Sequence, residues 1–212
     1  MVDIRIPYKK DSEERERNVD MCLKNWYDLG FTPLIDIVKG EPTDLFHRTK
    51  SVNKFLNDSM ADICIFCDCD CLILERGQID TAIDLASIGF PLIIPYSMTW
   101  NVTPEQFEKR ERVDRMGVDG MSYGGIVIFN RMKYLEYGGD NVKMIGWGNE
   151  DFERFERIKK LHGHVPRVDG DMWHLKHPRV EKLDMADINN LELQKIKAMP
   201  KDELLKYIGE WK

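Results

Sequence analysis

The stretch Ile63-Cys64-Ile65-Phe66-Cys67-Asp68-Cys69-Asp70-Cys71-Leu72-Ile73 is the most informative part of this sequence. Its first half, with Asp62–Phe66, is rich in β-branched and aromatic residues, a pattern typical of a buried strand. Two aspartates follow at once. Because ligands of open α/β sheets bind beyond the carboxyl ends of the strands, this pair stands where a site is expected.

Strand and helix signals alternate on both sides of this stretch. The sequence predicts strands at Val2–Pro7, Phe31–Val38, Asp62–Phe66, Pro91–Pro95 and Ile126–Phe129. It predicts helices at Ser12–Leu29, Phe46–Met60, around Ala82–Ser87, and at Thr103–Met116, Met132–Tyr137 and Glu150–Leu161, with a polar amphipathic tail from Val180. The alternation favours an α/β fold, with a mostly parallel sheet flanked by helices. Without a repeat or a linker, we expect one domain.

Length and composition exclude several classes of protein. The 212 residues suit one domain, and a net charge of −6 argues against a chain that grips nucleic acid through its phosphates. No apolar run approaches the roughly 18 residues that a membrane span needs, and the first residues lack the apolar centre of a signal peptide. Four of the five cysteines crowd into positions 64–71 at spacings that fit neither a disulfide framework nor zinc knuckles. We expect reduced thiols and a cytoplasmic protein.

The aspartate pair favours a divalent metal ion. In an extended chain Asp68 and Asp70 would share one face, and two adjacent carboxylates repel each other unless a cation lies between them. A hard ion such as Mg²⁺ or Mn²⁺, completed by phosphate oxygens, is the expected partner. The alternative is that both residues merely cap a turn, since D-x-D is common by chance.

Six motifs, in order along the chain, resemble the metal-dependent nucleotide-sugar glycosyltransferases of the GT-A fold, in particular the β-1,4-galactosyltransferase-like branch and related family 2 enzymes. They are Ile6-Pro7-Tyr8-Lys9, Phe46-His47-Arg48-Thr49-Lys50-Ser51-Val52-Asn53, Asp68-Cys69-Asp70, Gly124-Gly125, Gly146-Trp147-Gly148-Asn149-Glu150-Asp151 and His174-Leu175-Lys176-His177. The G-W-G-x-E-D hexapeptide is the most specific. The chain departs from the family at Lys9 and Asp11, where arginines are usual, at Asn149 (glycine) and at His174 (methionine).

The resemblance implies a single GT-A (Rossmann-like) domain with a nucleotide-binding part at about residues 1–100, an acceptor and catalytic part at about 101–180, and a helical tail at 181–212. It makes Asp151 the general base and Glu150 an acceptor or donor contact. The implied nucleotide-sugar contacts are Pro7, Tyr8, Lys9, Phe46, Arg48, Asn53, Asp68, Gly125 and Trp147. The implied metal ligands are Asp70, His177 and His174, with Asp68 on the ribose or in the water shell of the ion. Imidazole ligands favour Mn²⁺ over Mg²⁺.

Each of these residues also has a purely structural explanation. Phe46 and Trp147 could fill the core, Gly125 could form an ordinary turn, and the two histidines could lie in a surface turn. The acids that open the helix at Glu150 are favoured there by the helix dipole. We read the charged residues that follow, including Arg154 and Arg157, as a solvated helix face.

The predicted function is an inverting, metal-dependent transfer of sugar from a UDP-sugar to an acceptor hydroxyl of a glycan, a cell-wall polymer or a hydroxylated DNA base, in a bacterial or phage-encoded enzyme. A DNA acceptor would need a basic face, for which Lys109, Arg110, Arg112 and Arg115 are candidates. One alternative is a nucleotidyl- or phosphotransferase with paired aspartates and Mg²⁺, although no glycine-rich phosphate loop follows the first strand. The other is a non-catalytic sugar- or nucleotide-binding module, against which the Glu150-Asp151 pair argues.

Overall fold

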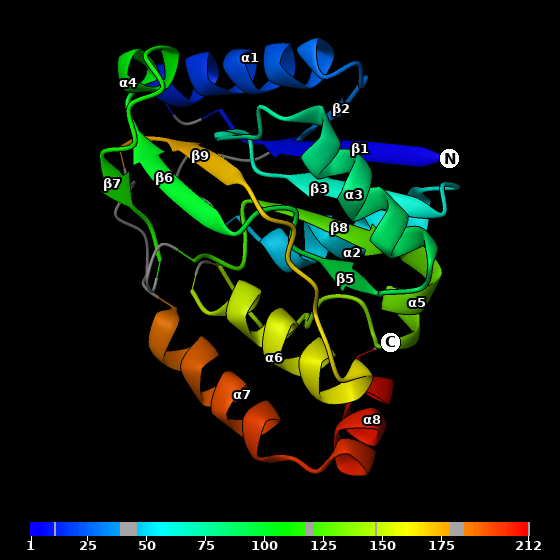
Figure 1. The fold of residues 1–212 in the computed structure, drawn as a ribbon. Coiled ribbons are helices and arrows are strands. Elements are labelled where there is room, and N and C mark those ends of the chain that lie inside the picture. Colours follow the sequence, from blue (N-terminus) through cyan, green and yellow to red (C-terminus); the bar gives the residue numbers. More distant parts are fainter. Residues whose placement is uncertain (11, 39–45, 118–120, 147, 179–184, 212) are drawn as a thin grey trace.

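A central mixed sheet organises the described part of the chain, which in this computed structural model is residues 1–212 except 11, 39–45, 118–120, 147, 179–184 and 212 (Figure 1). The strand order is β2-β1-β3-β8-β5. The bounds are β1 Val2–Tyr8, β2 Leu34–Ile37, β3 Ile63–Cys67, β5 Leu92–Ile93 and β8 Ile126–Asn130. β1 pairs in parallel with β2 and β3, whereas β8 runs antiparallel to both β3 and β5. The expected α/β fold is confirmed, but the sheet is mixed because β8 enters it in the opposite direction.

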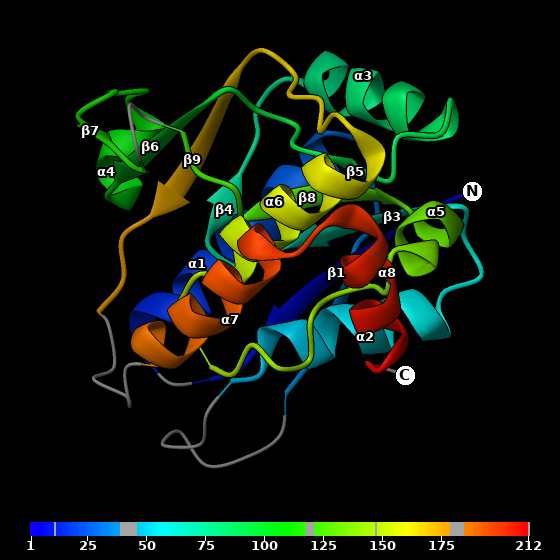
Figure 2. The same ribbon diagram turned by 90° about the horizontal axis from the view of Figure 1, so that it is seen from below.

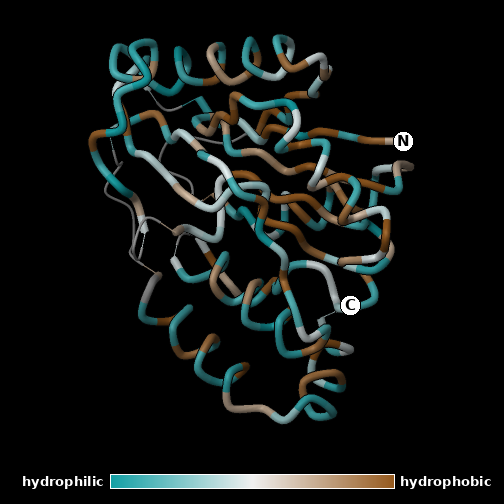
Figure 3. The backbone as a smooth tube through the Cα atoms, viewed as in Figure 1, coloured by the Kyte–Doolittle hydropathy of each residue, from teal (hydrophilic) through white to brown (hydrophobic). Residues whose placement is uncertain are grey.

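Strand β3 lies at the centre of this sheet and is buried along its whole length. Its side chains alternate between the two faces. Trp26 of helix α1 (Glu13–Asp28) donates a hydrogen bond to Cys67 Sγ, while the Arg48 guanidinium of helix α2 (Arg48–Asp58) lies over Phe66 on the other face. Burial on both faces explains the continuous apolar run, and the brown band through the strands in Figure 3 follows it.

Helices cover both faces of the sheet. The remaining bounds are α1 Glu13–Asp28, α2 Arg48–Asp58, α3 Arg76–Ser87, α5 Arg131–Glu136, α6 Glu150–His162, α7 Ala186–Ala198 and α8 Lys201–Gly209. Ser12 caps α1 by accepting a hydrogen bond from the Arg15 amide, and Gly30 follows its end with φ 79°. Helices α7 and α8 pack beside α6 at the end of the chain (Figure 2). No helix among the described residues is long and apolar enough to cross a membrane.

A second, smaller sheet was not expected from the sequence. Its order is β4-β9-β6-β7, with β4 Cys71–Leu72, β9 Asp171–Leu175, β6 Met98–Val102 and β7 Asp114–Arg115. β4 begins directly after the two aspartates and pairs with β9, so that Cys71 lies opposite His174. This pairing brings a segment about 100 positions later in the sequence to the end of β3.

The predicted helix Thr103–Met116 is wrong beyond its first turns. Helix α4 spans only Pro104–Glu108, although the expected cap at Thr103 is present as a complete capping box with Gln106. Arg110 then takes a left-handed backbone with φ 59°, which a helix cannot continue through. Its guanidinium lies 4.6 Å from the Phe107 ring, and the chain returns along β6 as strand β7.

Candidate active site and metal centre

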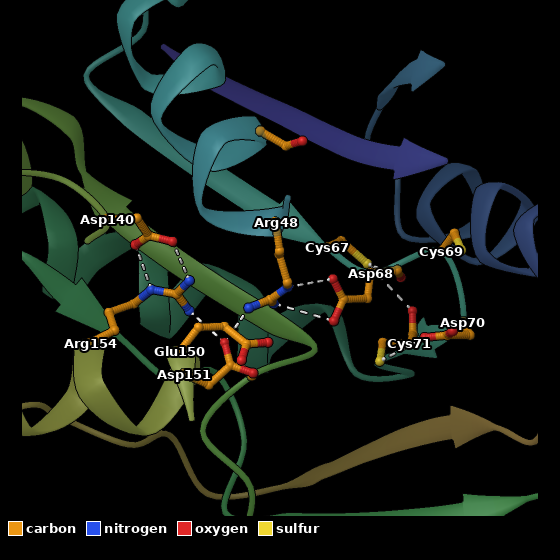
Figure 4. A network of polar contacts seen from close by, with 12 residues as sticks. Arg48, Cys67, Asp68, Cys69, Asp70, Cys71, Asp140, Glu150, Asp151 and Arg154 are labelled. Carbon is orange, nitrogen blue, oxygen red and sulfur yellow. Dashed lines mark hydrogen bonds and ion pairs between the residues drawn. The ribbon is translucent and has the colours of Figure 1, made fainter. Parts of the chain in front are cut away.

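The two aspartates lie in a turn at the end of β3 and point to different partners. The Cys71 amide donates a hydrogen bond to the Asp68 carbonyl at 3.1 Å, which closes the turn. Asp68 faces Arg48 (Figure 4), whereas Asp70 faces His174 and His177. The expectation that the two carboxylates share one face of an extended chain is therefore wrong, because the strand has already ended at Cys67.

Asp70, His174 and His177 converge on one point. Each offers a ligand atom, and these atoms lie within 4.8 Å of one another. Asp70 Oδ2 is 3.2 Å from His177 Nε2, and Asp70 Oδ1 is 3.8 Å from His174 Nε2. β9 supplies His174, and the segment that follows β9 supplies His177. The predicted trio of metal ligands is thus brought together by the second sheet.

The surroundings of the two imidazoles suit metal binding. His174 Nδ1 lies 3.0 Å from Asn101 Oδ1, and His177 Nδ1 lies 2.9 Å from the Pro178 carbonyl. Both partners can accept a hydrogen bond from an Nδ1–H group, and in that tautomer each Nε2 lone pair would be available to a metal ion bound beside Asp70. One carboxylate and two imidazoles form a donor set that fits Mn²⁺ well and Mg²⁺ less well.

Positive charge around Asp70 keeps its carboxylate ionised. Burial alone would raise the pKa of this carboxyl, which is 4% exposed. The hydrogen bond from His177 and the charges of His174, His177 and Arg15 outweigh burial and lower the pKa to about 2. An ionised carboxylate is the form that binds a cation.

A chain of carboxylates and arginines runs from the Asp68 turn into helix α6 (Figure 4). The Arg48 guanidinium contacts both Asp68 oxygens, at 3.0 and 3.2 Å, and also donates to Asp151 Oδ1. Arg154 donates to the same Asp151 oxygen at 2.8 Å and binds Asp140 through two further nitrogens at 2.8 and 2.6 Å. Asp151 is thus held between two guanidinium groups.

Arg48 and Arg154 are buried, and their carboxylate partners offset the cost of burying two positive charges. They are 6% and 0% exposed. Burial opposes the charge of Arg48, yet the carboxylates of Asp151 and Asp68 more than offset it and raise its pKa. Each guanidinium has two carboxylate partners, so removing one acid would leave a buried charge only partly compensated, which is costly.

Glu150 and Asp151 occupy different environments at the start of α6. Glu150 is 5% exposed and accepts a hydrogen bond from the Gly148 amide at 2.7 Å, whereas the Asp151 side chain is 29% exposed. Burial, and next the charge of Asp151, raises the pKa of Glu150 to about 7. Asn149 precedes the pair with φ 65°, a left-handed backbone that asparagine tolerates better than most residues, which explains why it can stand in place of glycine.

Comparison with known proteins identifies the fold of the chain. A family model described as the N-terminal domain of galactosyltransferase matches residues 116–181, under half of the chain but including Glu150, Asp151 and both histidines. No curated protein matches the chain. The catalytic domain of Drosophila β1,4-galactosyltransferase 7, solved with xylobiose, has a TM-score of 0.61 at 16% identity, over 95% of this chain and 82% of that one. The chain has the GT-A glycosyltransferase fold.

Two further GT-A structures carry donor ligands. A variant of the Drosophila enzyme, solved with manganese, UDP-Gal and xylobiose, has a TM-score of 0.51 at 17% identity, over 96% of this chain and 78% of that one. GalNAc-T7, solved with UDP, GalNAc and Mn²⁺, has a TM-score of 0.58 at 11% identity. That match covers 99% of this chain and 54% of the other, so the chain spans about half of GalNAc-T7. The predicted resemblance to the GT-A enzymes is confirmed.

Other residues predicted for the nucleotide sugar lie at the end of β1 and at the start of α2. Pro7 and Tyr8 end β1, and Lys9, 7% exposed, follows them. Phe46 is half-buried just before α2, and Arg48 opens that helix. Trp147 lies outside the described residues.

The Asn53 amide is engaged with another part of the chain. It donates to the Asp140 carbonyl at 2.8 Å, and its oxygen accepts from the Asp140 amide at 2.7 Å. Asn53 therefore fixes the loop that carries the carboxylate partner of Arg154.

The paired glycines are packed by protein atoms. Gly125 has φ 80°, and a Cβ atom there would lie 2.9 Å from Cys71 Sγ and 2.7 Å from Met172 Cε. Gly124 is tighter still, since a Cβ atom would lie 1.8 Å from Asp151 Oδ2. Gly124 thus makes room for the predicted base.

Several residues of the site were missed or misread in the sequence. Arg15, Asn101 and Asp140 carried no signal as site residues. The interpretation of Arg154 and Arg157 as a solvated face is wrong, since both are fully buried. Arg154 binds Asp140, and Arg157 binds Glu153 and the carbonyls of residues 137 and 139, which is why the interior accepts their charge.

Proposed function

We propose that the chain is an inverting, metal-dependent glycosyltransferase that moves a sugar from a UDP-sugar to an acceptor hydroxyl. The observation that carries this proposal is the cluster of Asp70, His174 and His177. Arg48 links the turn that carries Asp70 to the proposed base, because it donates hydrogen bonds to both Asp68 and Asp151. Two similar structures support the choice of metal and donor: one was solved with manganese and UDP-Gal, and the other with Mn²⁺ and UDP.

The ligand trio would hold Mn²⁺ at the end of β3. Bound there, the ion supplies positive charge against the negative charge that develops on the leaving diphosphate. In this proposal Asp68 would contact the ribose or a water of the ion, and Arg48 binds both oxygens of its carboxylate. Arg48 binds Asp68 of the same turn, and Phe46 precedes it by two residues, so these two are the proposed nucleotide contacts.

Asp151 is the better candidate for the general base. It is the more exposed acid of the pair and has a second oxygen, Oδ2, beside Gly124. Glu150 is more deeply buried and is bound to the Gly148 amide, which suits a contact with the acceptor or donor rather than proton transfer. One base carboxylate that activates the acceptor opposite the leaving group gives inversion at the anomeric carbon.

A glycan or polymer hydroxyl is favoured as acceptor over DNA. Three of the four basic residues considered for DNA contact other side chains of the protein. Arg110, Arg112 and Arg115 lie over the rings of Phe107, Trp173 and Trp100, and Arg112 also pairs with Asp171 at 2.7 Å. Guanidinium groups stacked and paired in this way are poorly placed to bind phosphates.

The free cysteine thiols are compatible with a cytoplasmic location.

Donor turnover tests this proposal against both alternatives. The full chain is incubated with UDP-Gal, UDP-Glc, UDP-GalNAc, UDP-GlcNAc or GDP-Man, with Mn²⁺ or EDTA, and free nucleoside diphosphate is measured. We expect release of UDP from at least one UDP-sugar with Mn²⁺ only. Release of pyrophosphate from UTP and a sugar phosphate would indicate a nucleotidyltransferase. Binding of a UDP-sugar without any release, with or without a panel of simple sugars as acceptors, would indicate a binding module.

A further inference from the structure

Arg15 reaches from the first turns of α1 into the metal centre. Its Nη1 lies 3.5 Å from Asp70 Oδ2 and 3.8 Å from Cys69 Sγ, and its Nη2 lies 3.1 Å from His177 Nδ1. The side chain is 22% exposed, so the guanidinium borders the site and keeps contact with solvent. The capping bond from the Arg15 amide to Ser12 fixes the start of the helix that carries it.

A guanidinium at this place is unfavourable for binding a cation alone. Asp70 is the only carboxylate of the described ligand trio, and the two imidazoles bind metal in their neutral form. With a divalent ion in place, one negative charge would face three positive ones. The excess of positive charge matches a ligand that brings two negative charges, as the diphosphate of a nucleotide sugar does.

The chemistry of arginine fits the same ligand. Its planar fork binds phosphate oxygens through two parallel hydrogen bonds, and it stays charged at any working pH. Both terminal nitrogens of Arg15 lie beside ligands of the proposed ion. A diphosphate that completes the metal shell from the α1 side would therefore meet this guanidinium.

We propose that Arg15 is a diphosphate-binding residue that contacts the donor and the departing UDP. This inference rests on the proposed function and adds a residue to it. The competing explanation is that Arg15 only balances the charge of Asp70. The two explanations predict different effects on nucleotide binding. A residue that only pairs with Asp70 has no reason to strengthen the binding of UDP, whereas a diphosphate-binding residue does.

The test is calorimetry on the full chain with three ligands: Mn²⁺ alone, UDP at saturating Mn²⁺, and uridine, which lacks phosphates. Arg15→Ala should weaken UDP by about tenfold to a hundredfold, the range for a lost hydrogen bond between charged groups. It should leave Mn²⁺ affinity unchanged or higher and uridine affinity unchanged, and Arg15→Lys should restore part of the UDP affinity. Arg17→Ala is the matched control, since Arg17 lies on the same helix, is exposed and donates a hydrogen bond to the neighbouring Asn18.

Retained Mn²⁺ binding also shows that the variant is folded at this site. UDP affinity within about threefold of the parent, well below that range, would overturn the role of Arg15 while the proposed function stands. A parallel loss of Mn²⁺ and UDP binding would overturn it too, because Arg15 would then be a support of the metal centre. If the parent itself binds no UDP with Mn²⁺, the proposed function fails, and this inference fails with it.

Discussion

Gly124 provides a direct test of the position of Asp151. A Cβ atom at residue 124 would lie 1.8 Å from Asp151 Oδ2, 2.4 Å from its Cγ and 2.8 Å from its Oδ1. Ordinary contact needs about 3.5 Å, so in Gly124→Ala the carboxylate must retreat by about 1.7 Å. Gly124 does not have a positive φ, so alanine is compatible with its backbone and the effect is confined to the contact.

The Asp151 carboxylate cannot retreat without losing its ion pairs. Arg48 and Arg154 both bind its Oδ1. A displacement of about 1 Å in a reacting group can cost about a hundredfold in rate, so we expect turnover of Gly124→Ala to fall by at least that factor. The affinity for UDP with Mn²⁺ should change little, because the ligand trio is untouched.

The assay is UDP release under saturating donor, beside calorimetry with UDP. Gly77→Ala is the matched control, because a Cβ atom at residue 77 would meet no atom within 4 Å. In an Asp151→Ala background the added Gly124→Ala change should have almost no effect, since the clash and the base are both gone. Turnover of Gly124→Ala within about threefold of the parent, far short of a hundredfold loss, would refute the placement of Asp151 as the base.

Three further changes test the acid network. Asp151→Asn should lower turnover by about a hundredfold to ten-thousandfold in steady-state kinetics and leave UDP affinity nearly unchanged; a smaller loss would move the role of base to Glu150. Asp140→Asn breaks its buried pair with Arg154 and should lower the free energy of unfolding in urea by about 3–5 kcal/mol, whereas an unchanged midpoint would contradict the burial of that pair. The folded pKa of Glu150 is raised from 4.5 to about 7, so its contribution to stability is present below pH 4.5 and is lost as the pH rises through about 7. The unfolding free energy of the parent should therefore fall between pH 4.5 and about 7, and Glu150→Gln should remove that fall. Parallel curves of unfolding free energy against pH for parent and variant would contradict this prediction.

The local features of the site could be predicted from the sequence. Strand β3 and the acids after it are contiguous, and burial on both faces leaves a continuous apolar run that is easy to recognise. The start of α6 at Glu150 was also predicted, because acids in a first turn are a local signal. These features depend on neighbours in the chain, so the sequence alone is sufficient.

The second sheet could not be predicted in the same way. β4 and β7 have two residues each, too few for any periodicity, and they exist because β9 and β6 lie beside them. The distance between Asp70 and His174 depends on that pairing. The trio was therefore predicted from a family resemblance and not from the pattern of the chain.

Buried charge was the other source of error. Arg154 sits in a helix full of charged residues, which are usually solvated. Its burial depends on Asp140, which Asn53 and the turn around residues 138–141 hold in place from another element. Only the folded chain shows that compensation.

The central claim is that Asp70, with the two histidines, holds a metal ion that joins the protein to the diphosphate of the donor. The most direct test is titration of UDP into the parent and into Asp70→Asn, each with Mn²⁺ and with EDTA. Asp80→Asn serves as control, because Asp80 is an exposed partner of Arg76 on α3. We predict that the parent and the control bind UDP more tightly with Mn²⁺ than with EDTA, and that Asp70→Asn binds it equally weakly in both. Equal affinity of the parent in the two conditions, or metal-dependent binding that survives in Asp70→Asn, would contradict the claim.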